Sequence, residues 1–222
     1  MAIEVETKDC TALSDAELGE LGDICAGGTA GYDIGLLSKQ RDEWVLITQA
    51  RNNGALQGFA FSTLERIGGT PCVLVGLLSV KRTGKRNEAL KGLMTELLRR
   101  AVLAFPDEDV LIGTRFADPS GYEAFSAPLK LHDIVPMPDH KPTGEDRAWG
   151  RRLAKRFGVD ANYDERAFLA KANGTACVLD HESAKPEKLA HLKELFADVR
   201  LDQGDSLVAF GWAMAEDLAP LA

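Results

Sequence analysis

The sequence lacks any long hydrophobic run. No apolar stretch approaches the ~18 consecutive residues of a membrane-spanning helix. The acidic start, Met1–Glu6, also has no apolar segment of the kind that a signal peptide carries. We therefore expect a cytoplasmic protein without a membrane partner.

Cysteine and histidine are scarce as well. No two of the four cysteines have the Cys-x-x-Cys spacing of a zinc site or a redox dithiol. They are Cys10, Cys25, Cys72 and Cys177. His132 and His140 lie in a proline-containing stretch at a spacing that suits no metal pair. We expect free thiols, ordinary loop histidines and no metal site.

An excess of positive charge is also missing. The 26 Lys and Arg are outnumbered by 34 Asp and Glu, which gives a formal net charge of −8. This balance argues against general nucleic-acid binding, which needs a basic face. It still permits a local basic site, and the cations do gather in Lys81-Arg-Thr-Gly-Lys-Arg86.

That basic stretch lies where a predicted strand passes into a predicted helix. Cys72–Val80 is apolar and rich in β-branched residues, as in a buried strand. The helix follows, with apolar residues on one face: Leu90, Leu93, Met94, Leu97 and Leu98. A helix N-terminus favours anions through its free N–H groups and its dipole. The segment is either a phosphate or pyrophosphate cradle or a solvated turn, and it matches neither the P-loop nor the Gly-x-Gly-x-x-Gly pattern.

The order of predicted elements indicates an α/β fold with a mixed central sheet flanked by helices. We expect one domain over residues 1–222. Helices are predicted at 13–26, 34–41, 90–104, 121–131, 146–157 and 186–199. Strands are predicted at 44–50, 56–64, 72–80, 110–115, 175–179 and 206–214, and the first three form a meander.

This order and the basic loop resemble the GCN5-related N-acetyltransferase (GNAT) superfamily. Its loop pattern, Arg/Gln-x-x-Gly-x-Gly/Ala, is best matched by Arg86-Asn-Glu-Ala89-Leu-Lys91, in which Ala89 and Lys91 replace small residues. Glycine lets backbone N–H groups approach phosphates closely, so Lys91 is the harder replacement, although its own side chain could meet a phosphate. The resemblance covers residues 1–131. We interpret 132–170 as an insertion and 171–222 as closing strands and a helix.

The resemblance implies an N-acyltransferase that uses acetyl-CoA or another acyl-CoA as co-substrate and acylates a primary amine on a small molecule or peptide. In the family, main-chain groups of the strand that precedes the loop bind the pantetheine arm. The implied cofactor-binding residues are Leu78, Ser79, Val80, Gly84, Lys85, Arg86, Asn87, Ala89 and Lys91. Tyr122 is the implied general acid for the leaving thiolate, because a phenol stays protonated at neutral pH. It could equally be a core or surface tyrosine.

No general base stands out, because the strand 72–80 holds no carboxylate. Glu65, Asp118 and Glu123 are candidates, each weighed against a solvated surface charge. The basic helix 146–158 is interpreted as an insertion near the substrate mouth that contacts an acidic partner, or as a solvated face. The net negative charge favours a cationic amine acceptor.

Two other functions stay open at this point. One is a non-catalytic binding or regulatory protein on the same fold, which the altered loop and the missing base favour. The other is a protein that binds a different phosphorylated ligand. A homodimer is also left open.

Overall fold

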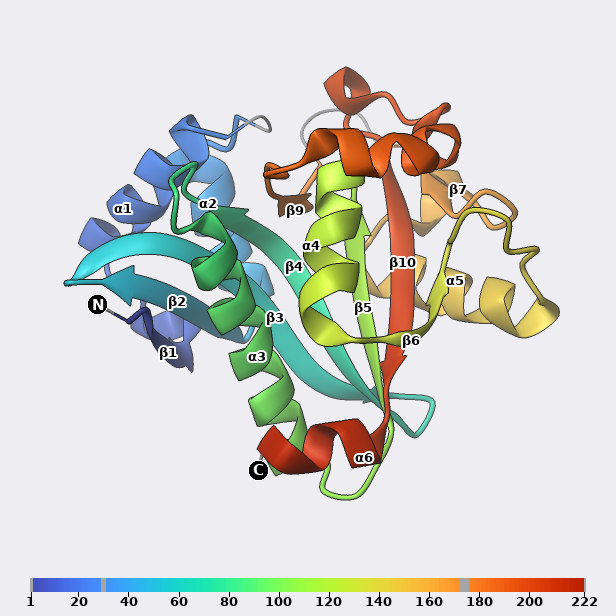
Figure 1. The fold of residues 1–222 in the computed structure, drawn as a ribbon, viewed down its shortest axis with the longest axis horizontal. Coiled ribbons are helices and arrows are strands. Elements are labelled where there is room, and N and C mark those ends of the chain that lie inside the picture. The colour runs from blue at the N-terminus through green and yellow to red at the C-terminus, as the bar shows by residue number, and fades with distance from the viewer. Residues whose placement is uncertain (1, 29–30, 172–175, 222) are drawn as a thin grey trace.

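The computed structural model describes residues 2–28, 31–171 and 176–221, and it contains one mixed β-sheet with helices on both faces (Figure 1). The first four strands are antiparallel neighbours in the order of the sequence. They are β1 (Glu4–Asp9), β2 (Leu46–Asn52), β3 (Ala55–Ile67) and β4 (Thr70–Val80). The predicted fold class, α/β with a mixed central sheet and flanking helices, is confirmed.

Two tight turns set the register of this meander. Asn53 and Gly54 connect β2 to β3 with φ angles of 52° and 79°, the left-handed conformation for which an Asn-Gly pair is favoured. Gly68 and Gly69 connect β3 to β4 with φ angles of 61° and 92°. A side chain at either glycine would strain the backbone.

The fifth strand, β5 (Val110–Phe116), is parallel to β4 over a short stretch only. In the described part of the chain, their pairing extends from Cys72 opposite Leu111 to Leu74 opposite Gly113. Beyond these residues the two strands diverge (Figure 1). The far half of β4 therefore needs a different partner for its main-chain groups.

A short strand, β9 (Leu179–Asp180), supplies that partner. It pairs in parallel with β4, with Leu179 opposite Leu78 and Asp180 opposite Ser79. In Figure 1 it lies at the open end of the diverging pair, beside β4. The sequence predicted a strand at 175–179 but did not predict this neighbour.

The last long strand, β10 (Ser206–Ala213), is antiparallel to β5 and extends the same sheet. Three short strands lie beyond it: β6 (His132–Val135) and β8 (Leu169–Ala170), which pair with β10, and β7 (Tyr163–Asp164), which pairs with β8. Residues far beyond the part that carries the family resemblance thus build the sheet next to β5.

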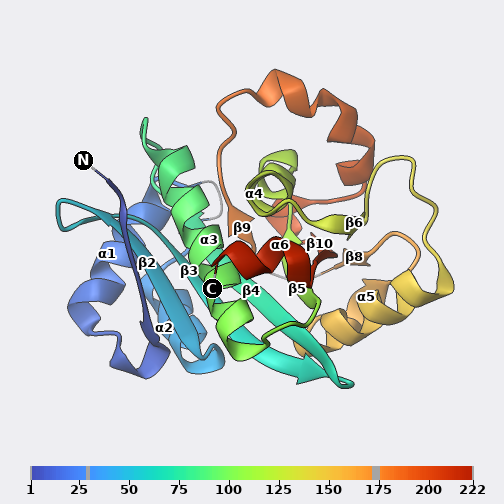
Figure 2. The same cartoon turned by 60° about the horizontal axis from the view of Figure 1, so that its bottom comes forward.

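Helices cover both faces of the sheet (Figures 1 and 2). On one face lie α3 (Arg86–Ala104) and α4 (Pro119–Leu129). On the other lie α1 (Asp15–Ala26), α2 (Ile34–Glu43) and α5 (Gly144–Arg156). The remaining helices are short or of 3-10 type: η1 (Cys10–Ala12), η2 (Asp160–Asn162), η3 (Pro186–Phe196), η4 (Leu201–Gln203), α6 (Ala215–Leu218) and η5 (Ala219–Leu221).

Local sequence explains where the main helices begin and which face they bury. Ser14 caps α1 in a reciprocal pair with Glu17, and Thr143 caps α5 in the same way with Asp146. The predicted apolar face of α3 is buried against the sheet, in a core shared with α4 and β5. Separate cores form under α1 and α2 and under α5.

Four strands were missed, namely β1, β6, β7 and β8, of which the last two are only two residues long, and one helix differs in type. β1 and β6 escaped prediction because both are short, partly exposed and carry charges. The helix predicted at 186–199 is the 3-10 helix η3, which ends at Phe196.

The basic helix α5 lies over β5 and β10, not near the start of α3. Its leucine, Leu153, packs in the core with Leu111 and Phe210. Its cations are engaged within the chain, because Arg156 forms an ion pair with Glu65 (2.6 Å) and Arg152 stacks on Trp149. These contacts fit a solvated helix face, and the placement near a substrate mouth stays a prediction.

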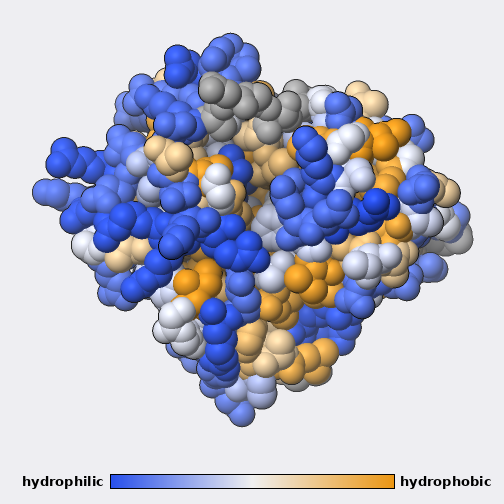
Figure 3. All heavy atoms as spheres, turned by 180° about the vertical axis from the view of Figure 1, so that it is seen from behind, coloured by the Kyte–Doolittle hydropathy of each residue, from blue (hydrophilic) through white to orange (hydrophobic). Residues whose placement is uncertain are grey.

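Seen from behind, the face that carries α1, α2 and α5 is largely hydrophilic, with a hollow near its centre where hydrophobic residues reach the surface (Figure 3). Within the described ranges, we find no helix with the length and apolar content to cross a membrane. The same residues contain no group of three His, Cys, Asp or Glu side chains that could hold a metal ion.

Candidate functional site

The loop between β4 and α3 leaves the start of the helix open. Lys85 precedes the first turn of α3, and no side chain among the described residues caps this end. Arg86 lies at the first helical position, and its Nε is buried without a hydrogen-bond partner in the described part of the chain. Free N–H groups, the helix dipole and a buried unsatisfied donor together favour an anion here.

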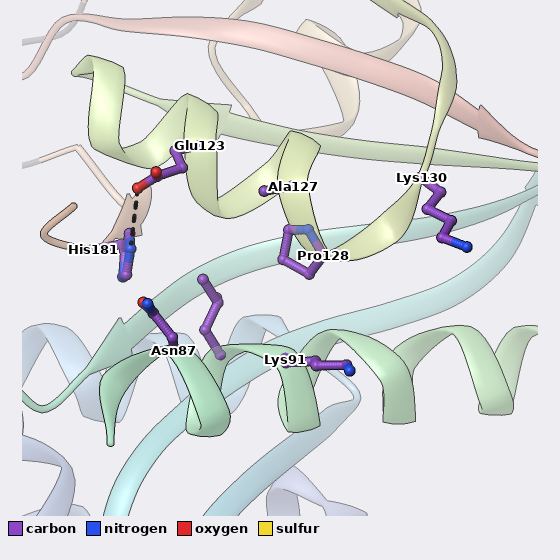
Figure 4. Close-up of a pocket in the computed structure, with 8 residues that line it drawn as sticks. Asn87, Lys91, Glu123, Ala127, Pro128, Lys130 and His181 are labelled. Atoms are coloured by element: carbon purple, nitrogen blue, oxygen red, sulfur yellow. Dashed lines mark ion pairs between the residues drawn. The ribbon is translucent and has the colours of Figure 1, made fainter. Parts of the chain in front are cut away.

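A pocket of about 420 Å³ opens beside this helix start, between α3 and α4 (Figure 4). Two lysines contribute positive charge to its wall, and Figure 4 shows them toward one end, with Glu123 and His181 at the other. The lining residues are Asn87, Leu90, Lys91, Glu123, Ala127, Pro128, Lys130 and His181. Of the residues predicted to bind the cofactor, the pocket brings Asn87 and Lys91 together.

The main chain of β4 is not free where the resemblance implied that it would be. The Leu78 N–H donates to the carbonyl oxygen of Val178 (3.3 Å), and Ser79 lies opposite Asp180 in β9. The expectation of open main-chain groups at Leu78 and Ser79 is therefore wrong for this structure. The reason is physical, because buried backbone groups must find partners and β5 has already diverged.

Asp180 anchors the β9 segment to the basic loop. Its carboxylate is 3% exposed and accepts a hydrogen bond from Ser79 Oγ (2.9 Å). It also forms an ion pair with Arg82 (2.5 Å), and the same guanidinium donates to the main-chain oxygens of Val80 and Asp180. A Cβ atom at Gly28 would collide with the Asp180 carboxylate, so only glycine fits there.

Tyr32, in the connection between α1 and α2, holds the segment from a second side. Its hydroxyl donates to the Ala176 carbonyl oxygen (2.8 Å) and accepts from the Val178 N–H (3.2 Å). The tyrosine is buried, and burial raises the pKa of its phenol well above the usual value. The five residues that carry these bonds or lie beside them are almost fully buried: Ala176, Val178, Leu179, Asp180 and His181.

His181 is the functional candidate that sequence reasoning missed. Its Nε2 lies 3.6 Å from Oε2 of Glu123, and its Nδ1 is buried without a partner among the described residues. Burial lowers the pKa of the imidazole, and the nearby cations Arg82 and Arg86 lower it further, while Glu123 acts in the opposite direction. The ring is therefore neutral near pH 7 and able to accept a proton.

Tyr122 lies on α4 in the core shared with β5. It is 8% exposed, and its ring meets the edge of Phe116 at a centroid distance of 5.4 Å. Burial raises the pKa of the phenol, which keeps it protonated at neutral pH. The structure thus places Tyr122 beside the diverging strands, and its role as general acid stays a prediction.

The three predicted carboxylate bases have different positions. Glu123 lines the pocket. Asp118 caps α4 by accepting from the Ser120 and Gly121 N–H groups, and burial raises its pKa. Glu65 pairs with Arg156, away from the pocket.

The two histidines predicted in loops lie apart from the pocket, and His132 in fact begins the strand β6. His132 contacts Asp217 (2.8 Å), and His140 contacts Asp146 (3.0 Å). Neither residue lines the pocket between α3 and α4.

No family model matches the chain, and no curated protein sequence does. Solved structures of N-acetyltransferases do match it. Aminoglycoside 6'-acetyltransferase type Ii is 14% identical, with a TM-score of 0.44 over 60% of this chain and 86% of that one. A GNAT-family acetyltransferase from Bacillus cereus ATCC 10987 is 17% identical, with a TM-score of 0.42 over 62% and 90%. The aminoglycoside 6'-N-acetyltransferase from Enterococcus faecium is 15% identical, with a TM-score of 0.41 over 53% and 64%, so the chain spans less than two thirds of that enzyme.

The strand order itself supports the predicted architecture. An antiparallel meander leads into a parallel pair, β4 and β5, that is joined through α3 and diverges. This is the element order that the resemblance to the GNAT superfamily implies for residues 1–131.

Proposed function

We propose that this protein binds acyl-CoA and transfers the acyl group to a primary amine. The observation that carries the proposal is the uncapped start of α3, where the buried Arg86 Nε lacks a partner in the described chain beside a lysine-lined pocket. Phosphate oxygens would satisfy both the helix N–H groups and the guanidinium. Charge and shape at the start of α3 therefore fit the phosphate-rich end of acyl-CoA.

In this proposal, different residues bind different parts of acyl-CoA. Lys85, Arg86 and the N–H groups of Asn87 and Glu88 would hold the pyrophosphate. Lys91 and Lys130 would meet further phosphate, since both line the pocket wall. Main-chain groups of Leu78 and Ser79, once they are released from β9, and of Val80 would pair with the pantetheine arm.

Acyl-CoA supplies an acyl group activated as a thioester. When an amine nitrogen bonds to the thioester carbon, the carbon–sulfur bond breaks, the nitrogen must lose a proton and the sulfur must gain one. Tyr122 would donate the proton to sulfur, since its raised pKa keeps it protonated. Glu123 is the proposed acceptor for the amine proton, because it lines the pocket from α4.

Titration calorimetry with acetyl-CoA and with adenosine 3′,5′-bisphosphate tests this function. We expect both ligands to bind, and the double variant Arg86→Ala, Lys91→Ala to lose both. A release assay for the CoA thiol with a panel of small amines and peptide N-termini then tests transfer. Failure of both ligands to bind at millimolar concentration would overturn the proposal.

A second candidate is a non-catalytic binding or regulatory protein on this fold. The observation that favours it is that β9 and its neighbours already pair with the main chain of β4. In that case the bisphosphate would bind while acetyl-CoA would gain no affinity over it. The two functions are therefore separated by the affinity that the acyl-pantetheine arm adds.

A further inference from the structure

We propose that the segment Ala176–His181 is a built-in competitor for acyl-CoA, and that it and the pantetheine arm exclude each other on β4. The inference rests on the proposed function and adds its regulation. It starts from one donor, the Leu78 N–H, which Val178 already uses. An amide N–H forms one good hydrogen bond, so a second extended chain cannot pair there at the same time.

The segment imitates both the extended pantetheine arm and the phosphate of acyl-CoA. Its main chain adds to β4 as a parallel strand, which is how an extended arm would be recognised. Its Asp180 carboxylate provides an anion for Arg82, a cation of the loop that would otherwise meet a phosphate. Ser79 Oγ is engaged by the same carboxylate.

The competing segment is held by bonds that can be removed singly. Tyr32 donates to Ala176 and accepts from Val178 without touching Arg82 or β4 in the bonds described. Asp180 supplies the charged contact. A Tyr32→Phe variant therefore weakens the segment alone, whereas Asp180→Ala weakens the segment and also frees Arg82.

These contacts predict different responses for two ligands. In the closed form the segment is paired with β4, and in the open form it is detached. If the closed form dominates, the apparent affinity for acetyl-CoA is the affinity of the open form multiplied by the fraction of molecules that are open. Tyr32→Phe should then tighten acetyl-CoA binding about two- to tenfold, the range for loss of one or two neutral hydrogen bonds. Binding of adenosine 3′,5′-bisphosphate, which has no pantetheine arm, should stay unchanged. Asp180→Ala should tighten acetyl-CoA about tenfold or more, because the lost contact is charged.

Calorimetry on wild type and both variants measures these shifts, and hydrogen exchange follows the segment directly. Acetyl-CoA should increase exchange across 176–181 while it protects 81–88, and the bisphosphate should protect 81–88 only. Tyr163→Phe is the matched control, since it removes another buried tyrosine hydroxyl, on the α5 side of the sheet. It should change neither affinity. Thermal melts show whether each variant is folded. If Asp180→Ala does not fold, Tyr32→Phe still provides the test.

Three outcomes are decisive. Tighter acetyl-CoA binding in the variants with unchanged control affinity supports the competition. Equal acetyl-CoA affinity in all folded variants, with 176–181 still protected in the complex, overturns the competition and leaves the proposed function intact. Absence of binding by either ligand in every variant overturns the proposed function itself.

Discussion

The two halves of β4 show how one strand serves two purposes. Its first half pairs with β5 at Cys72 to Leu74, and those residues lie between core side chains on both faces. Its second half pairs with β9, two residues long, at Leu78 and Ser79. Both halves are equally buried, so burial alone does not distinguish a structural pairing from one that a ligand can replace. The difference lies in how much chain must move to break each pairing.

We expect the largest effect from shortening one buried leucine in each of the two pairings. Leu74 in β4 and Leu179 in β9 are both fully buried. We expect Leu74→Ala to lower the free energy of unfolding by about 2–5 kcal/mol through the cavity it leaves. Leu179→Ala should cost less, because the short segment can detach locally while the sheet stays folded. Urea unfolding measures both, and equal costs would mean that β9 is as integral to the folded sheet as the first half of β4.

A Tyr122 variant tests whether the half of β4 that pairs with β9 forms part of a catalytic site. It follows Gly121, where a Cβ atom would lie 2.9 Å from the Leu179 carbonyl oxygen, so the start of α4 closely abuts β9. With a productive amine, Tyr122→Phe should lower kcat about a hundredfold if the phenol protonates the thiolate. Acetyl-CoA affinity should change little. An unchanged kcat would remove Tyr122 from the mechanism and favour a water-mediated proton.

Arg86 tests the anion site at the end of the second half. Arg86→Ala should weaken adenosine 3′,5′-bisphosphate binding about tenfold, because one charge-assisted hydrogen bond is lost. Arg99→Ala is the matched control, since it removes the same charge from the far part of α3, where Arg99 pairs with Glu96. Calorimetry at two salt concentrations compares them. Similar losses in both variants would indicate general charge attraction in place of a site.

The smallest effect concerns pH. The pKa of His181 is lowered in the folded protein, chiefly by burial. Unfolded chains therefore bind a proton that the folded protein does not as pH falls below about 6.5, the ordinary pKa of histidine, and stability drops in that range. We expect the free energy of unfolding to fall more between pH 7 and pH 5.5 in wild type than in His181→Gln. Identical slopes would show that His181 contributes nothing measurable to the pH dependence of stability.

The part of the site formed by β4, the basic loop and α3 was largely predictable, because its sequence signals are local. The apolar strand 72–80, the basic loop and the apolar face of α3 follow from spacing within a few turns of the chain. The turn residues Asn53 and Gly54 fixed the hairpin for the same reason. These elements depend on neighbours in sequence, and the structure has them where the patterns indicate.

The contacts of β9 were not predictable, because they join residues that are 98 to 144 positions apart in the sequence. Ser79 with Asp180, Arg82 with Asp180 and Tyr32 with Ala176 are set by topology alone. His181 carries no spacing signal of its own, since its partner Glu123 lies on another element. A search for buried charges could have noticed Asp180 only after β9 was placed beside β4.

The outermost strand, β1, has a consequence for how molecules of this protein meet one another. An edge strand offers main-chain groups to any neighbouring chain, and such edges are where proteins aggregate. β1 carries four charged residues in six, Glu4, Glu6, Lys8 and Asp9, and is partly exposed. A second copy that added a strand there would have to bring its own charges against these, so the edge resists extension of the sheet from one molecule into the next.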